Sequence, residues 1–382
     1  MTATVSGTGV RFTVPSITPA ARDAALAVLD SGWITTGPEC AAFESELAAA
    51  LGADHVVTVA TCTQALELCL RALRLPAGAP VLTASLTFSG AVAAIVHAGY
   101  RPVLVDIDSE TLLPSPATVA AAGRAAAMVV THLGGTPADV PALAAAAGLP
   151  PSRVVEDAAH GPGGDLTGAG AQAACFSFYA TKNLPIGEGG AVATTDGDLA
   201  GWLRSARLHG MSRDAWRRYL PGGSWRYDVP EIGFKANLTD LQAAIGRAQL
   251  AALPEWQARR AAIAARYDAA LAEGVATGLV RLPRRHPGSA WHLYQVRVPH
   301  RDAVIERLTA AGIGTSVHFI PVHQLTAYAE LLGPDAAGAV PVTERVAEEL
   351  LSLPLYPALT DHQIDMVATA LLTALDDLGG DT

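Results

Sequence analysis

The sequence is poor in cysteine, in aromatic residues and in basic residues. Its four cysteines, Cys40, Cys62, Cys69 and Cys175, show no CxxC or Cys/His spacing. This scatter argues against a zinc site or a disulfide framework and favours a reducing cytosol. Lys and Arg number 26 against 36 Asp and Glu, for a formal charge of −10, and no basic run is interleaved with aromatic residues. A nucleic-acid partner is therefore not expected.

Long apolar segments of the kind that target or anchor a protein are also missing. The first residues, "MTATVSGTGVRF", contain no apolar stretch, so we predict no signal peptide and a cytoplasmic protein. Between Arg74 and Arg101 no charged residue occurs, but Pro76, Pro80 and several Ser, Thr and Gly residues interrupt the segment. This pattern predicts a strand, a loop and a buried helix instead of a membrane span.

What the chain does have is enough apolar material for a large core. Half of its 382 residues are hydrophobic and 16% are charged. From "HVVTVA" to "GAVATT", apolar runs typical of strands alternate with Ala-rich helical segments. Strands this continuously apolar are buried on both faces, which predicts an α/β fold with a mostly parallel sheet flanked by helices. After "PEWQARRAAIAARYDAALAEG", which reads as one long helix, the elements become shorter. We predict a large domain over residues 1–250 and a smaller α+β domain over 251–382.

Two loops that follow predicted strands carry residues suited to a charged ligand. Thr61, Cys62 and Thr63 open a helix whose free N–H groups suit a phosphate, although an ordinary Thr N-cap is the alternative. Asp157 ends the strand in "VVEDAAH", so its carboxylate faces the crevice where such sheets bind ligands. A pyridinium N–H would satisfy it, and a structural cap of the next turn is the alternative.

Two further loops add an amine and an amide. In "FSFYATKNLPIGEGG", Ser177 can donate to a phosphate, and Lys182 can form an imine with an aldehyde cofactor. A lysine is more often a solvated charge, but this one lies between a buried aromatic strand and an uncharged turn. In "GFKANLTDLQAA", Lys235 and Asn237 precede a helix, which Asn237 or Thr239 could simply cap.

For two histidines and a threonine, the sequence leaves both a structural role and a role in the substrate pocket open. His318 and His323 in "VHFIPVH" lack the spacing of HExxH and a third ligand, so no metal site is predicted. They are expected to be structural or to line the substrate. Thr36 in "TTGP" either lines a sugar pocket or helps to cap the helix that follows Pro38.

In their common order, these blocks resemble the DegT group, the pyridoxal-phosphate sugar aminotransferases of fold type I. The resemblance extends over nearly the whole chain, and "SFYATKN" and "NLTDLQAA" are its most specific blocks. It implies that Lys182 is the Schiff-base lysine and that Asp157 is the partner of the pyridine nitrogen. Phe88 matches the aromatic residue stacked on the cofactor ring, and His160 matches a position near the ring's phenolic oxygen.

The resemblance also implies a phosphate site and an oligomeric state. The positions that match phosphate ligands within the chain are Thr61, Cys62, Thr63 and Ser177. Asn237 matches an Asn that reaches the phosphate from the neighbouring subunit, so a homodimer with shared active sites is implied. Many relatives carry Ser-Gly-Thr where this chain has Thr61-Cys62-Thr63, and the loop "GPGGDLTGAGAQAA" lacks a basic residue that many relatives have.

The function implied is transfer of an amino group from L-glutamate, or a similar donor, to a keto-sugar, with pyridoxamine phosphate as the intermediate form of the cofactor. An NDP-linked 4-keto deoxyhexose is preferred to a 3-keto one as substrate, and amino-sugar and antibiotic biosynthesis are the implied settings. Thr36, Lys235, His318 and His323 are the candidate substrate contacts. Alternatives are an aminotransferase for a cyclitol or another ketone, and a catalytically idle cofactor-binding partner. The related dehydratases replace the lysine with His, so Lys182 argues against that branch.

Overall fold

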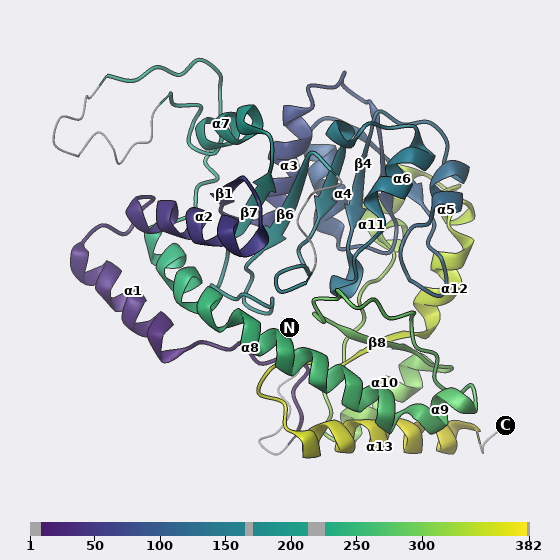
Figure 1. The fold of residues 1–382 in the computed structure, drawn as a ribbon. Coiled ribbons are helices and arrows are strands. Elements are labelled where there is room, and N and C mark those ends of the chain that lie inside the picture. Colours follow the sequence, from purple (N-terminus) through teal and green to yellow (C-terminus); the bar gives the residue numbers. More distant parts are fainter. Residues whose placement is uncertain (1–8, 165–170, 213–225, 380–382) are drawn as a thin grey trace.

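A computed structural model describes residues 9–164, 171–212 and 226–379 (Figure 1). Seven strands form one sheet in the order β1-β7-β6-β5-β4-β2-β3. All neighbouring pairs are parallel except the two that β7 makes, with β1 and with β6. The predicted mostly parallel sheet is confirmed. Its strands are β1 (His55–Val59), β2 (Pro80–Ala84), β3 (Arg101–Val105), β4 (Ala127–Thr131), β5 (Val154–Asp157), β6 (Ala173–Ser177) and β7 (Gly190–Thr194).

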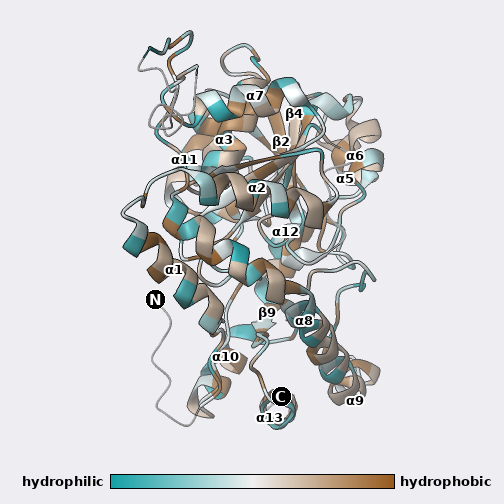
Figure 2. Cartoon of the chain, turned by 60° about the vertical axis from the view of Figure 1, so that its left-hand side comes forward, coloured by the Kyte–Doolittle hydropathy of each residue, from teal (hydrophilic) through white to brown (hydrophobic). Residues whose placement is uncertain are grey.

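Helices cover both faces of this sheet, because successive side chains of each strand point to opposite faces. Cys175 and Val192 pack with α3 (Cys62–Ala72), α4 (Ser89–His97) and α7 (Gly197–Ala206). Their neighbours Phe176 and Ala193 pack on the other side with α2 (Pro38–Leu51) and the start of α8 (Asp240–Ala270). On that same side, α5 (Pro116–Ala121) and α6 (Val140–Ala147) cover the half of the sheet around β2 and β4. The hydrophobic residues of the sheet are enclosed between the two helical layers (Figure 2).

A second apolar cluster lies in the C-terminal part of the chain. The antiparallel strands β8 (Tyr294–Arg297) and β9 (Leu350–Leu353) pack with α10 (Arg301–Ala310), α13 (Asp361–Gly379) and the second half of α8. The remaining α-helices of the described residues are α1 (Pro19–Ser31), α9 (Ala272–Ala276), α11 (Thr326–Leu332) and α12 (Pro341–Glu349). Strand β9 was not predicted, because three leucines and one serine between helices carry no clear alternating pattern.

Helix α8 is longer than the sequence suggests. The expected helix starting at Pro254 is in fact the second part of a continuous helix that begins at Asp240. A proline removes one hydrogen bond from a helix interior, but here α8 packs along α1 and α2 on one side of Pro254 and against α13 on the other. The predicted domain boundary at residue 250 stays a prediction, and it falls inside this helix.

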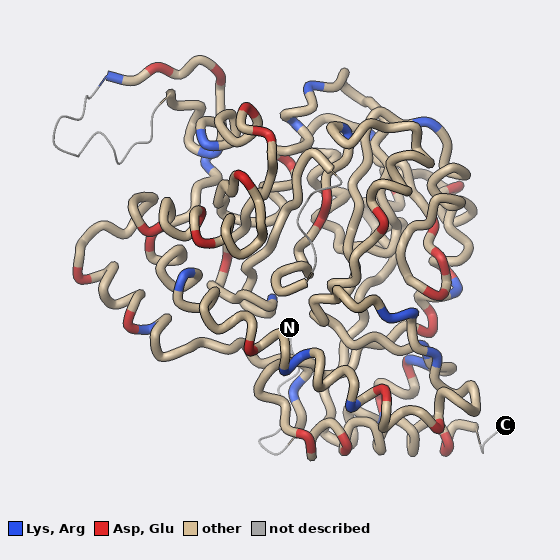
Figure 3. Tube along the Cα trace, in the orientation of Figure 1, with Lys and Arg blue, Asp and Glu red and all other residues tan. Residues whose placement is uncertain are grey.

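Charges are spread over the molecule. Figure 3 shows Lys and Arg distributed among Asp and Glu over many elements. Among the residues that the structure describes, no helix combines the length and apolar character needed to cross a bilayer. In the same part of the chain, no three His, Cys, Asp or Glu side chains are grouped to hold a metal ion.

Asp240 joins the start of α8 to the start of α2. The first N–H groups of a helix have no partner within it. Asp240 Oδ1 accepts hydrogen bonds from the amides of Gly37 at 2.7 Å and Cys40 at 3.0 Å, and Oδ2 accepts one from Glu39 at 3.2 Å. The carboxylate is buried and also complements the positive end of the α2 dipole. It therefore fixes the segment before α2 against the segment that carries Asn237.

We predict that Asp240→Ala lowers the free energy of unfolding by about 2–4 kcal/mol, because three buried amides lose a charged acceptor. Asp240→Asn should lose less, since its side-chain oxygen still accepts. The shift of the urea-unfolding midpoint measures both, with the exposed Asp23→Ala of α1 as control. An Asp240→Ala variant as stable as the control would contradict this role.

Candidate active site

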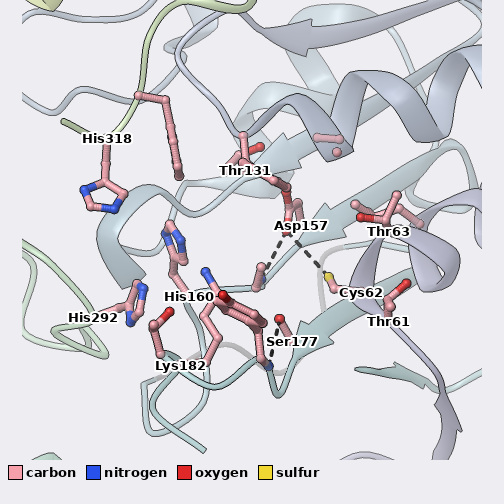
Figure 4. A pocket seen from close by; sticks show the side chains of 18 of the residues that line it. Thr61, Cys62, Thr63, Thr131, Asp157, His160, Ser177, Lys182, His292 and His318 are labelled. Carbon is pink, nitrogen blue, oxygen red and sulfur yellow. Dashed lines mark hydrogen bonds between the residues drawn. The ribbon is translucent and has the colours of Figure 1, made fainter. Parts of the chain in front are cut away.

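A cavity of about 590 Å³ opens at the carboxyl ends of β4, β5 and β6. This is the edge of a parallel sheet at which ligands bind. Figure 4 shows that its lining side chains come from strand ends, from the start of α3 and from loops of the C-terminal part. The structure brings together nine of the predicted site residues on this lining: Thr61, Cys62, Thr63, Phe88, Asp157, His160, Ser177, Lys182 and His318.

Asp157, the last residue of β5, supplies a buried carboxylate. It is 5% exposed, and a carboxylate in such a place requires donors or a cation. Its Oδ1 accepts a hydrogen bond from the amide of Ala159 at 3.1 Å, and Cys62 Sγ lies 3.9 Å from the same oxygen. Burial raises the pKa of Asp157, while these donors and the charge of Lys182 act in the opposite direction. The site is thus prepared for one more positive or hydrogen-donating group.

Lys182 supplies an amine in the same cavity. The chain turns after β6, and the amide of Lys182 donates to the carbonyl of Tyr179 at 2.8 Å. Burial lowers the pKa of the Lys182 ammonium from 10.5 to about 8, although the Asp157 charge opposes this. Near neutral pH, Lys182 is therefore an uncharged amine in a larger fraction of molecules than an ordinary lysine would be. The uncharged amine is the form that attacks a carbonyl group.

Asn183 holds the Lys182 loop in place and was not predicted from the sequence. Its buried side-chain amide donates to the carbonyls of Pro162 at 3.1 Å and Ala290 at 2.7 Å, and its Oδ1 lies 3.1 Å from His292 Nδ1. Three segments distant in sequence thus meet at the residue next to the amine. The only sequence signal was its place in the "SFYATKN" block.

Histidines form one wall of the cavity. The ring centroids of His160 and His292 lie 4.3 Å apart, and His318 contributes a third ring. Burial lowers the pKa of His160 and His292 well below the ordinary range and that of His318 to about 4. His160 Nδ1 accepts a hydrogen bond from the amide of Gly134 at 3.1 Å. The wall is therefore neutral at physiological pH and offers hydrogen bonds without charge.

The first turn of α3 forms a cradle for an anion. Thr61 caps the helix by accepting a hydrogen bond from the amide of Gln64 at 3.1 Å. Gly190 of β7 lets the sheet approach this turn closely, because a Cβ there would lie 2.6 Å from the amide nitrogen of Cys62. Thr63 and Ser177 add hydroxyl groups to the lining beside the positive end of the helix.

Four predicted residues lie outside this lining. Lys235 Nζ donates to Asn237 Oδ1 at 2.6 Å, and Asn237 Nδ2 donates to Thr36 Oγ1 at 2.6 Å, so these three form a separate polar cluster. His323 is buried, with Nδ1 2.7 Å from Ser85 Oγ and Nε2 bonded to Glu344. Residues 165–170 of the glycine-rich loop lie outside the described residues. Lining residues not predicted as site residues include Thr131, Tyr179, Glu188 and Phe319.

Comparison with known proteins identifies the family. The family model described as the DegT/DnrJ/EryC1/StrS aminotransferase family matches residues 15–372. The chain belongs to the DegT/DnrJ/EryC1/StrS aminotransferase family. The predicted family and the fold of these aminotransferases are thereby confirmed.

Individual proteins that are similar to this DegT-family chain support the same family assignment. The spore coat polysaccharide biosynthesis protein SpsC of Bacillus subtilis is 43% identical over 358 residues, which cover 90% of this chain and 91% of that protein. The putative sugar aminotransferase Spr1654 of Streptococcus pneumoniae, in a pyridoxamine-phosphate form, is 29% identical with a TM-score of 0.88, covering 97% of this chain and all of that one. DesV of S. venezuelae, solved with a ketimine intermediate, is 37% identical with a TM-score of 0.82, covering 93% and 94%.

The predictions of an aminotransferase and of a pyridoxal-phosphate cofactor are confirmed by these likenesses, since Spr1654 is also solved in the pyridoxal-phosphate form. The side chains present in this DegT-family cavity fit that cofactor. An amine, a buried carboxylate, an aromatic ring and a helix N-terminus all line the same space. Each of these matches one chemical feature of pyridoxal phosphate: the aldehyde, the ring nitrogen, the ring face and the phosphate.

The lowered pKa of Lys182 predicts how the apoprotein recombines with pyridoxal phosphate. The protonated amine does not react, so the rate constant should rise with pH and level off above about pH 8, whereas an ordinary lysine would keep rising to about pH 10. Asp157→Asn removes a charge that favours the ammonium and should move the midpoint to lower pH. Visible absorbance measured after mixing follows the reaction. A rate that still rises steeply above pH 9.5 would contradict the assignment.

Proposed function

We propose that the protein moves an amino group from L-glutamate to a keto-sugar carried on a nucleoside diphosphate, with a 4-keto deoxyhexose as the preferred substrate. The observation that carries the proposal is the amine of Lys182 and the carboxylate of Asp157 in one cavity of a DegT-family fold. The names of SpsC and Spr1654, which refer to polysaccharide biosynthesis and to a sugar aminotransferase, support a sugar substrate. The resemblance of "GFKANLTDLQAA" to relatives that act on 4-keto sugars supports the position of the ketone.

In this proposal each lining residue has one task toward the cofactor. Asp157 accepts from the ring nitrogen and Phe88 covers a ring face. His160, neutral because of its lowered pKa, lies near the phenolic oxygen. The hydroxyl groups of Thr63 and Ser177 and the first-turn amides of α3 hold the phosphate. When bound, pyridoxal phosphate supplies an aldehyde that takes up the amino group and a cationic ring that withdraws electrons.

Lys182 then has two tasks. Its amine would bind the aldehyde of the cofactor, and the same amine would move a proton from the α-carbon of the amino donor. Proton transfer is fastest when the pKa of the group is near the working pH, and burial brings the pKa of Lys182 to about 8. Asn183 holds the loop that carries it. Because the amino group is stored on the enzyme between two half-reactions, the kinetics should be ping-pong.

We also propose a homodimer in which each subunit completes the other's site. Asn237 lies outside the cavity of its own chain, clustered with Lys235 and Thr36. Large apolar side chains are exposed at the cavity, with Phe88 58% and Tyr179 45% accessible. A second copy that covers them would bring its Asn237 cluster to the phosphate, as the family resemblance implies.

The cytoplasmic location stays a prediction.

The substrate is tested by loading the enzyme as its pyridoxamine-phosphate form and adding single keto-sugars. A nucleotide-linked 4-keto deoxyhexose should restore the absorbance of the aldehyde form fastest, and its 3-keto isomer more slowly. Reaction with free cyclitol ketones but no nucleotide sugar would move the assignment to that alternative. An enzyme that binds cofactor but releases no 2-oxoglutarate from glutamate would be an idle partner, contrary to the proposal.

Lys182→Ala should lower the release of 2-oxoglutarate from glutamate by at least about 10³-fold, because one group both attaches the cofactor and transfers the proton. Lys182→Arg keeps the charge but has no reactive amine, so it should be equally inactive. Circular dichroism controls for folding. Turnover in Lys182→Arg close to that of the wild type would show that only a positive charge is required.

Asn237→Ala should weaken the affinity for pyridoxal phosphate by roughly tenfold, since one hydrogen bond to a charged phosphate is lost. Asn237→Asp should weaken it further, because a carboxylate repels the phosphate. Titration of the apoprotein measures both, and light scattering measures the mass against the 39.2 kDa chain. Wild-type affinity in both variants, or a monomer with full activity, would count against the shared site.

A further inference from the structure

The side chain of Cys62 lies between the first turn of α3 and the carboxylate of Asp157. Cys62 is 8% exposed and lines the cavity. Its Sγ is 3.9 Å from Asp157 Oδ1 and 3.5 Å from the carbonyl oxygen of Cys175 (Figure 4).

The Cys62 thiol is protonated in this environment. Burial, followed by the negative charge of Asp157, raises the pKa of Cys62 well above its ordinary value, and the charge of Lys182 only partly opposes this. A thiolate is required for nucleophilic chemistry and for metal binding. Cys62 is instead a neutral S–H group, a weak hydrogen-bond donor.

Two acceptors lie within reach of the thiol: the carbonyl oxygen of Cys175 is nearer, at 3.5 Å, and Asp157 Oδ1, at 3.9 Å, is the charged one. The carbonyl of Cys175 already accepts a hydrogen bond from the amide of Ala158 at 2.9 Å. Asp157 Oδ1 carries charge, and hydrogen bonds to ionised acceptors are the stronger ones. With the amide of Ala159, the thiol gives Oδ1 two donors. Among the described residues no hydrogen bond is made to Oδ2, which leaves that oxygen for a ligand.

We propose that Cys62 is a positioning residue whose thiol donates to Asp157 Oδ1, orients Oδ2 toward the cofactor's ring nitrogen and keeps the shared proton on that nitrogen. The inference rests on the proposed role of Asp157. A carboxylate that accepts two donors on one oxygen is a weaker base, so the proton stays with the ring. A protonated ring withdraws electrons more strongly and speeds the removal of the α-proton.

Two other ionisable side chains from neighbouring elements act on the pKa of Asp157. Lys182 follows β6, and His132 follows β4 with its Nε2 bonded to Glu156 Oε2 at 2.8 Å. Both side chains remain in place when Cys62 is replaced, and Cys62 is the weakest of the three influences on the pKa of Lys182. A change in the state of the ring nitrogen on replacing Cys62 therefore reports on the thiol.

The direct test is the ¹⁵N chemical shift of the ring nitrogen in holoenzyme loaded with ring-¹⁵N pyridoxal phosphate. Cys62→Ala and Cys62→Val, which remove the donor with and without a space left behind, should shift the signal toward the unprotonated value. Cys69→Ala, which removes another buried thiol from α3 away from Asp157, is the matched control. In Cys62→Ala and Cys62→Val, which lack the thiol donor, kcat should fall roughly three- to tenfold while the KM for glutamate stays unchanged.

The outcomes separate this inference from the proposed function. A protonated ring nitrogen in wild type, Cys62→Ala and Cys62→Val alike would overturn the role of Cys62 and leave that of Asp157 standing. An unprotonated ring nitrogen in the wild type would overturn both.

Discussion

The site depends on one electrostatic constraint: a buried carboxylate and a half-buried amine line the same cavity at one end of the sheet. Burial destabilises both charges, which raises the pKa of Asp157 and lowers the pKa of Lys182. The charge of each residue partly offsets the effect of burial on the pKa of the other. Their attraction is stronger than in water because the surroundings polarise poorly. A cofactor with a basic nitrogen at one end of its ring and an aldehyde at the other can satisfy both groups, which is why the family assignment and the geometry lead to the same chemistry.

The sheet provides the rigidity that this arrangement needs. Asp157 is paired with Thr131 of β4 and with Cys175 of β6, so its position is fixed by two parallel neighbours. Gly190 of β7 allows α3 to approach the same edge closely. The amine, in contrast, lies on a loop, and Asn183 ties that loop to segments near Pro162 and Ala290. The strands therefore fix the position of Asp157 and let the first turn of α3 lie beside the sheet. The loop that carries Lys182 is held by the buried side-chain amide of Asn183.

The sheet and the central residues could be predicted from the sequence because the signals are local. Asp157 ends a buried strand that begins with two valines, and Lys182 follows an aromatic one. Where the structure differs from prediction, distant contacts decide. Pro254 suggested the start of a helix, but packing on α1, α2 and α13 keeps α8 continuous. Asn183 is held by Ala290 and His292, more than a hundred residues away in the sequence. Phe319 reaches the cavity because the C-terminal part folds against the sheet. No local sequence pattern records either contact. Asn237 lies apart from its own cavity, so its predicted contact with the phosphate depends on the proposed homodimer.

The central claim is that Lys182 is the amine that binds pyridoxal phosphate. The chain has only two lysines, Lys182 and Lys235, so the alternatives are few. Borohydride reduction of the loaded protein, proteolysis and peptide mass spectrometry identify the labelled residue directly. The account predicts a pyridoxyl group on the peptide that contains Lys182 and none on the one with Lys235. A label on Lys235, or no label on either, would contradict it.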